Sequence, residues 1–82
     1  MPTVLREGPF SVRIYVGERE HGPPHVHIYL GSARATIWLG DSPSIPTLRE
    51  NKGLTAHELR KAKAVVLRNA DFLRAIWRRF HD

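Results

Sequence analysis

Two histidines separated by one residue are the clearest candidates for chemistry in this chain. His25 and His27 follow the double proline Pro23-Pro24, in a segment that alternates polar and apolar residues. Such alternation is typical of a β-strand, in which residues two apart point to the same face, about 6–7 Å apart at Cα. Two imidazoles at that spacing can act as an acid–base pair on one phosphate. His25 and His27 are therefore the candidate catalytic residues.

The same pair can also serve as metal ligands. His21 lies just before the prolines, and a metal hypothesis assigns His21, His25 and His27 to one divalent ion as a facial three-ligand site. Glu20 is a loop carboxylate that could approach the same face. The alternative is that both strand histidines are ordinary polar residues on a solvated sheet face.

The elements that position these histidines follow from hydrophobic periodicity. Period-two alternation predicts strands at about 10–16, 25–30 and 33–39. Gly31-Ser32 between the last two is typical of a two-residue type II′ hairpin turn. That turn predicts the cross-strand pairs Leu30–Ala33, Tyr29–Arg34, Ile28–Ala35, His27–Thr36 and His25–Trp38. A short edge strand at 47–50 would be a fourth.

The predicted pairing gathers cations and aromatic rings on the outward face of the sheet. Its members are Arg13, Tyr15, His25, His27, Tyr29, Arg34, Thr36 and Trp38. Such a face suits a stacked base with its phosphates held by arginine, so the candidate binding residues are Arg13, Tyr29, Arg34, Trp38 and His21. A protein interface uses the same residue types. Simple cross-strand support of the sheet is a third interpretation.

A capping box predicts the start of the C-terminal helix. Thr55 and Glu58 have the required spacing, and an apolar stripe at helical spacing continues to about residue 80. Asn69-Ala70-Asp71 is weak for a helix interior, which allows a kink or break there. The predicted fold is α+β: one domain, residues 1–82, with a three- to four-stranded antiparallel meander and a long helix, about 56–80, on one face.

The end of this helix is basic. Its cations are Arg68, Arg74, Arg78 and Arg79. They are predicted to form a solvated face, with contact to phosphate or an acidic partner as the alternative; Arg74 and Arg78, one turn apart, are the pair to test. Trp77 is predicted to lie in the core, and no role is predicted for His57 or His81.

Composition narrows the functional classes. The 82 residues carry a formal net charge of +5, which favours a polyanionic partner such as nucleic acid. The absence of cysteine excludes disulfides and thiolate metal sites, and there is no phosphate-binding P-loop motif. No apolar run reaches membrane-spanning length and no secretory leader is evident, so we expect a cytoplasmic protein without membrane contacts. The small core favours a homodimer.

Four sequence features resemble one small bacterial family. They are the opening Met-Pro-Thr-Val-Leu-Arg, the E-H-x-P-P-H-x-H box at 20–27, the Trp38-Leu39 strand end, and Asn51-Lys52-Gly53-Leu54-Thr55 before Glu58-Leu59. The family is catalogued as domain-of-unknown-function family 4160. The resemblance implies a bacterial protein often encoded beside a second small protein in a toxin–antitoxin-like arrangement, and hence a cognate protein partner. It assigns no catalytic role.

These observations predict the toxin-like member of a two-gene module, which binds or cleaves nucleic acid through the His/Arg/aromatic face. In a nuclease, Arg13 and Arg34 would hold the phosphate while His25 and His27 transfer protons or bind a divalent metal ion. One alternative is a non-catalytic protein-interaction module, either antitoxin-like or a partner-binding subunit. The other is a small metal-binding protein built on the histidine cluster.

Overall fold

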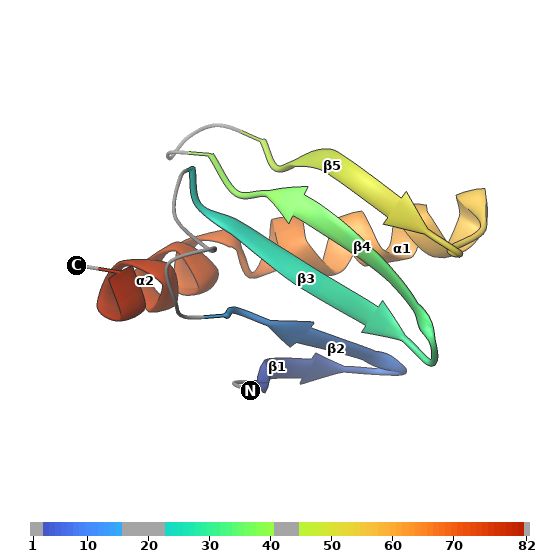
Figure 1. Ribbon diagram of the computed structural model, residues 1–82, viewed down its shortest axis with the longest axis horizontal. Helices are drawn as coiled ribbons and strands as arrows, with labels where there is room; N and C mark the ends of the chain where they lie inside the picture. Colours follow the sequence, from blue (N-terminus) through green and yellow to red (C-terminus); the bar gives the residue numbers. More distant parts are fainter. Residues whose placement is uncertain (1–2, 16–22, 41–44, 82) are drawn as a thin grey trace.

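The computed structural model describes residues 3–15, 23–40 and 45–81, which form a sheet of five antiparallel strands and two helices. The elements are β1 (Thr3–Glu7), β2 (Phe10–Arg13), β3 (His25–Leu30), β4 (Ala33–Trp38), β5 (Thr47–Lys52), α1 (Ala56–Arg68) and α2 (Ala70–His81). The strands pair in chain order, as a meander. Both helices lie along one face of the sheet (Figure 1). The predicted α+β class is therefore confirmed.

The β3–β4 hairpin has the predicted register. All the expected pairs are present, from Leu30–Ala33 at the turn to His25–Trp38 at the open end. Gly31 takes a φ of 59°, and no described residue other than glycine has a positive φ. A type I′ turn needs positive φ at both central residues, so this conformation fits the II′ turn instead. The turn residues thus set which side chains lie opposite one another.

The core lies between the sheet and the helices. Alternate residues of the central strands, such as Val12 and Ile28, are fully buried against apolar residues of both helices, such as Val66 and Leu73. Burying a side chain of this size stabilises a fold by about 1.5–3 kcal/mol. The helices therefore hold the inner face of the sheet, and the outer face is left for polar residues.

The number of strands is higher than predicted. β1 was missed because a register shift between Thr3 and Leu5 leaves Val4 unpaired and interrupts the alternation. β5 runs to Lys52 rather than ending at residue 50, and all of its residues are exposed, so no burial pattern marked it. The strand predicted at 10–16 ends at Arg13, and Val16 lies outside the described residues.

The two edge strands each carry an irregularity. Val4 is unpaired in β1, and in β5 Arg49 lies between Leu48 and Glu50, which pair with consecutive residues of β4. Unpaired residues of this kind increase the local twist and interrupt the hydrogen-bonding pattern of an edge. Neither edge of the sheet is therefore a regular strand.

The capping box is confirmed, and the helix predicted over about 56–80 is divided into two helices at Asn69, within the segment where a kink or break was allowed. The Thr55 hydroxyl accepts a hydrogen bond from the Glu58 amide at 3.1 Å, and the Glu58 carboxylate accepts one from the Thr55 amide at 2.9 Å. The helical path breaks at Asn69, whose side-chain amide donates to the Val65 carbonyl oxygen at 2.8 Å. Asparagine competes for backbone hydrogen bonds in this way, which makes it a weak helix-interior residue. Among the described residues, no helix is long and apolar enough to cross a membrane.

Candidate functional site

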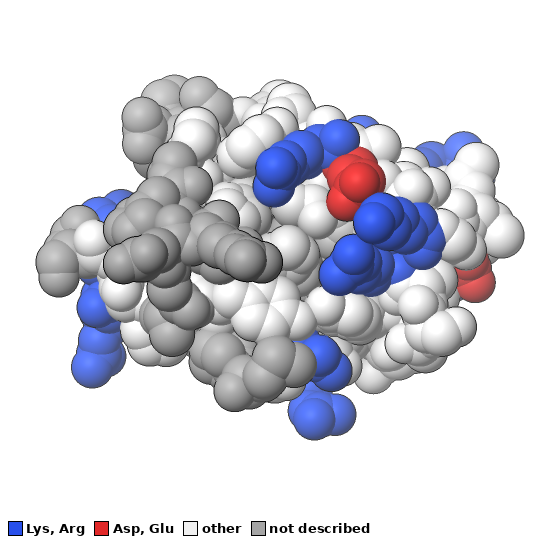
Figure 2. Space-filling model, in the orientation of Figure 1, with Lys and Arg blue, Asp and Glu red and all other residues white. Residues whose placement is uncertain are grey.

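The face of the sheet turned away from the helices, here called the open face, carries most of the predicted site residues. Directly paired residues share a face, so the observed register places together Arg13, His27, Tyr29, Arg34, Thr36, Trp38, Glu50 and Lys52. Figure 2 shows this face, with basic side chains gathered around an acidic group over β4 and β5. The open face thus combines cations and aromatic rings as the sequence predicted.

Two arginines of this face, two tyrosines and the contacts among them form a tyrosine–arginine cluster, made up of Arg13, Tyr15, Tyr29 and Arg34. The Arg13 guanidinium lies 4.2 Å from the centroid of the Tyr29 ring. The hydroxyl groups of Tyr15 and Tyr29 are 2.7 Å apart, and Arg34 hydrogen-bonds to Tyr29 as well. Tyr29 is therefore contacted by two cations, one at its ring and one at its hydroxyl group.

The two tyrosines differ in their electrostatic surroundings. Partial burial opposes ionisation of Tyr29, but hydrogen bonds from Tyr15 and Arg34 and the charges of Arg34 and Arg13 outweigh it, so the pKa of Tyr29 is lowered. Burial raises the pKa of Tyr15, and its hydrogen bond to Tyr29 raises it further. Tyr29 is therefore the phenol more easily ionised, and its ionised form would accept the shared hydrogen bond from Tyr15.

A spectroscopic titration can test this assignment, because the chain contains only two tyrosines. We expect tyrosinate absorbance to rise in two steps as the pH increases, one below and one above the ordinary tyrosine pKa of about 10. Arg34→Gln removes a cation that favours the phenolate, so the lower step should move up. Arg60→Gln, an exposed site on α1, is the matched control and should leave both steps in place. A single step at the ordinary pKa in the wild-type protein would contradict the assignment.

The two strand histidines lie together, but they are not equally accessible. Their ring centroids are 5.4 Å apart. His27 is half-buried, lies 3.3 Å from the Thr36 hydroxyl through Nδ1, and packs edge-on to Tyr15. His25 is only 3% exposed, so the expectation of a solvated outward position is wrong for this residue.

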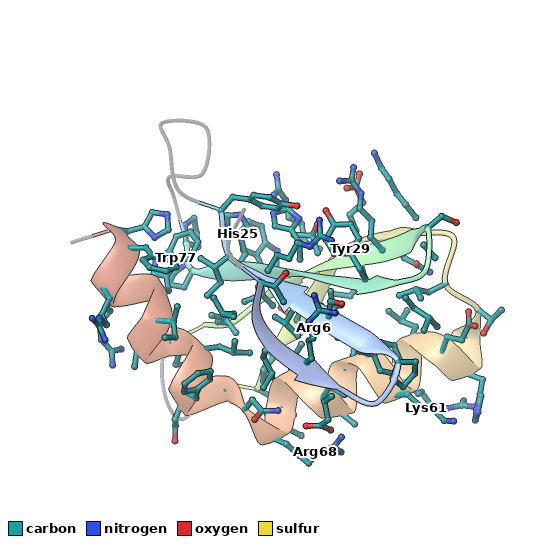
Figure 3. All side chains as sticks on the ribbon, turned by 90° about the horizontal axis from the view of Figure 1, so that it is seen from below. Arg6, His25, Tyr29, Lys61, Arg68 and Trp77 are labelled. Carbon is teal, nitrogen blue, oxygen red and sulfur yellow. The ribbon has the colours of Figure 1, made fainter. Side chains whose placement is uncertain are left out.

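The burial of His25 comes in part from the helix layer. Its ring centroid is 4.9 Å from that of Trp77 in α2 and 5.6 Å from that of Trp38 in β4. Figure 3 shows His25 and Trp77 at the same end of the molecule. His25 Nδ1 lies 3.0 Å from the Pro23 carbonyl oxygen, which can only accept, so the proton is on Nδ1. The double proline therefore fixes the orientation of His25 as well as the path of the chain.

His81 is a member of this group that sequence reasoning missed. Its ring stacks on Trp77 with centroids 3.7 Å apart and an interplanar angle of 16°. Its Nδ1 donates to the Trp77 carbonyl oxygen at 3.0 Å. The spacing of four residues between Trp77 and His81 is the signal that could have found it, because residues four apart are neighbours on a helix.

The metal hypothesis stays a prediction. His21, its third ligand, lies outside the described residues. Within residues 3–15, 23–40 and 45–81, no group of three or more histidine, aspartate or glutamate side chains is placed to hold a metal ion. Of the three histidines in this hypothesis, the structure thus describes His25 and His27. Their rings lie close together, but two imidazoles do not complete a metal site, so further ligands would be required.

Trp38 is half-buried, and a second cation–aromatic contact lies over its ring. The Arg49 guanidinium is 5.0 Å from the centroid of the Trp38 ring. Arg49 was not among the predicted binding residues, because its position depends on the irregular register of β5. The open face therefore has cation–aromatic pairs on both sides of the histidine strand.

The arginines of the basic helix end differ in burial, because Arg74 is buried whereas Arg78 and Arg79 are exposed. Arg74 is 7% exposed and donates to the carbonyl oxygens of Leu39 and Gly40, both at 2.9 Å, and to Asp71 at 2.8 Å. Its predicted place on a solvated or phosphate-binding face is therefore wrong. Arg78 and Arg79 are exposed, as predicted.

Comparison with known proteins places the chain in a family. The model of the domain of unknown function DUF4160 matches residues 10–78. The chain belongs to the DUF4160 family. The DUF4160 match begins at β2 and includes the tyrosine–arginine cluster, His25 and His27, whereas β1 precedes it. No curated protein and no solved structure matches the chain significantly.

Proposed function

We propose that this chain is a cytoplasmic protein that binds single-stranded nucleic acid on its open face. The observation that supports this most is the tyrosine–arginine cluster, in which Arg13 and Arg34 both contact Tyr29. Two guanidinium groups so close together favour a phosphate, since arginine matches its geometry. The aromatic rings of this face and the guanidinium groups over them are flat groups of the kind on which bases stack, and each stacked base would be worth about 1–3 kcal/mol.

The proposal extends to cleavage of the bound strand by a toxin-like member of a two-gene module. His27 is the more suitable proton-transfer group, because it is half-buried and lies beside the cluster through Tyr15. His25 is buried against the His27 ring and Trp77, which makes it a positioning residue. The phosphate held by Arg13 and Arg34 would then be the reacting group.

Binding of a labelled single-stranded RNA over a range of salt concentrations tests the first part. Arg13→Gln with Arg34→Gln should weaken binding at least about tenfold and reduce the salt-dependence slope by about 1.4, since each lost phosphate contact on a single strand accounts for about 0.7. The control is Arg60→Gln with Arg79→Gln, which removes the same charge from exposed helix positions. If this control weakens binding equally, or if the wild-type protein does not bind, the proposed site is wrong.

Cleavage is tested separately from binding. Expression of the wild-type protein should arrest growth and degrade RNA, and His27→Gln should abolish both effects while RNA binding is retained. Growth arrest or cleavage that survives combined replacement of His25 and His27 by alanine would contradict the catalytic part and leave the binding part standing.

A further inference from the structure

A second candidate site lies on the opposite side of the molecule from the tyrosine–arginine cluster. A pocket of about 250 Å³ opens between the β1–β2 turn and α1, with Phe10, Ala64 and Val65 as its apolar floor. Lys61, Arg68 and Glu7 form its rim. Figure 3 shows Lys61 and Arg68 along α1, well away from His25 and Tyr29 on the sheet.

The size of the pocket limits what it can hold. Pockets for cofactors and other small-molecule ligands usually have about 300–1,000 Å³, so this one suits a single large side chain. The floor is buried, with Phe10 at 5% and Val65 at 3% exposure. Such a concave apolar pocket is typical of the anchor position of a protein interface, where one side chain contributes much of the affinity.

The charge around the pocket is positive. The exposed cations of α1 are Arg60, Lys61, Lys63 and Arg68, whereas its carboxylate, Glu58, is engaged in the capping box. Lys61 has no ion-pair partner within the described part of the chain. This rim therefore attracts a ligand that carries carboxylates.

One carboxylate of the chain itself already shows how the rim binds such a group. Glu7 pairs with Arg68 and accepts a hydrogen bond from Asn69 at 3.2 Å. The hydrogen bond from Arg68 lowers the pKa of Glu7, and the bond from Asn69 lowers it further. A carboxylate brought by a ligand could pair with Lys61, which also lines the pocket.

We propose that this pocket docks an acidic segment of a partner protein, with one large apolar side chain on the floor and an adjacent carboxylate paired with Lys61. A nucleobase fits less well, because its polar edges would lose water over Phe10 and Val65 without gaining hydrogen bonds. An anionic membrane fits less well too, since membrane-surface binding uses projecting apolar side chains rather than a hollow. This site is independent of the open face and of the function proposed for it.

The test uses a synthetic peptide with one tryptophan between two pairs of glutamates, added to the full-length ¹⁵N-labelled protein. We expect amide shift changes at Gly8, Phe10, Ala64 and Val65. The same peptide with alanine for tryptophan should bind at least about tenfold more weakly, because it lacks the apolar side chain that fills the pocket. Shift changes confined to the open face, or no saturable change, would overturn the proposal.

Two variants and a control separate docking from general charge attraction. Ala64→Phe fills the pocket, and Lys61→Glu reverses the charge of its rim; each should reduce peptide affinity about tenfold or more. Lys63→Glu makes the same charge change on α1 but does not line the pocket, so it should have little effect. Equal loss with Lys63→Glu would show non-specific attraction and overturn the proposal.

Two further experiments test the other possible occupants of the pocket, which are RNA, a membrane and a second copy of the chain. Displacement of the peptide by single-stranded RNA or by phosphatidylserine vesicles would overturn the assignment to a protein partner. Concentration-dependent shifts at the pocket without peptide would assign it to a second copy of the chain instead, and also overturn it. An unchanged circular dichroism spectrum of Ala64→Phe would show that this variant is folded. If it also retains RNA binding while losing peptide binding, the pocket and the open face bind their ligands independently.

Discussion

Replacing Trp77 by alanine is expected to destabilise the fold by about 3–5 kcal/mol, the usual cost of removing a buried aromatic side chain. Trp77 is 6% exposed, belongs to the main core and contacts the rings of both His25 and His81. Small proteins have a total stability of about 5–15 kcal/mol. The loss would therefore remove a large part of the margin, and urea unfolding followed by circular dichroism would measure it.

Phe80→Ala is the matched control for this change. It removes an aromatic side chain from the same helix, but Phe80 is 40% exposed. We expect a cost of about 1 kcal/mol, since less apolar surface returns to water. Equal losses for the two variants would show that Trp77 does not hold α2 against the sheet.

Replacing Arg74 by methionine should cost about 3 kcal/mol, even though the residue lies on a helix with many surface cations. The guanidinium joins α2 to the carbonyl oxygens of Leu39 and Gly40 at the end of β4. Methionine fills a similar volume but donates no hydrogen bond, so these buried acceptors lose their donor. The midpoint of urea unfolding should fall accordingly.

Arg78→Met separates this effect from loss of charge. Arg78 lies one turn further along α2 and is exposed, and surface substitutions of this kind usually change stability by less than about 0.5 kcal/mol. A large loss at Arg78, or a negligible one at Arg74, would contradict the structural role assigned to Arg74. RNA binding should be unaffected by Arg78→Met, because the residue is not on the open face.

The central hairpin could be predicted from the sequence because two local signals agree there. Alternation marked 25–30 and 33–39 as strands, and Gly31 marked the turn that determines which residues pair. That pairing also predicts that Tyr29 lies opposite Arg34, as the structure confirms. β1 was missed because its unpaired Val4 interrupts the alternation. The edge strand predicted at 47–50 is present but extends to Lys52, and its end was missed because β5 has no buried residue.

The incorrect predictions of site residues concern contacts that a local sequence pattern does not encode. Spacing put His25 and His27 on one face, but the burial of His25 depends on Trp77, about fifty residues away in the chain. Arg74 was grouped with its helical neighbours because helical spacing says nothing about the carbonyl oxygens of Leu39 and Gly40. Arg49 meets Trp38 only because the β5 register shifts. Each of these contacts is determined by tertiary packing rather than by propensity.

The unpaired residues in β1 and β5 also affect how the chain behaves at high concentration. An open meander leaves strands at both sides where other molecules could add, the route by which β-rich proteins grow into fibrils. Here Val4 interrupts one side, and Arg49 interrupts the other beside the charged Glu50 and Lys52. These irregularities and charges should therefore disfavour the addition of further copies at the edges of the sheet.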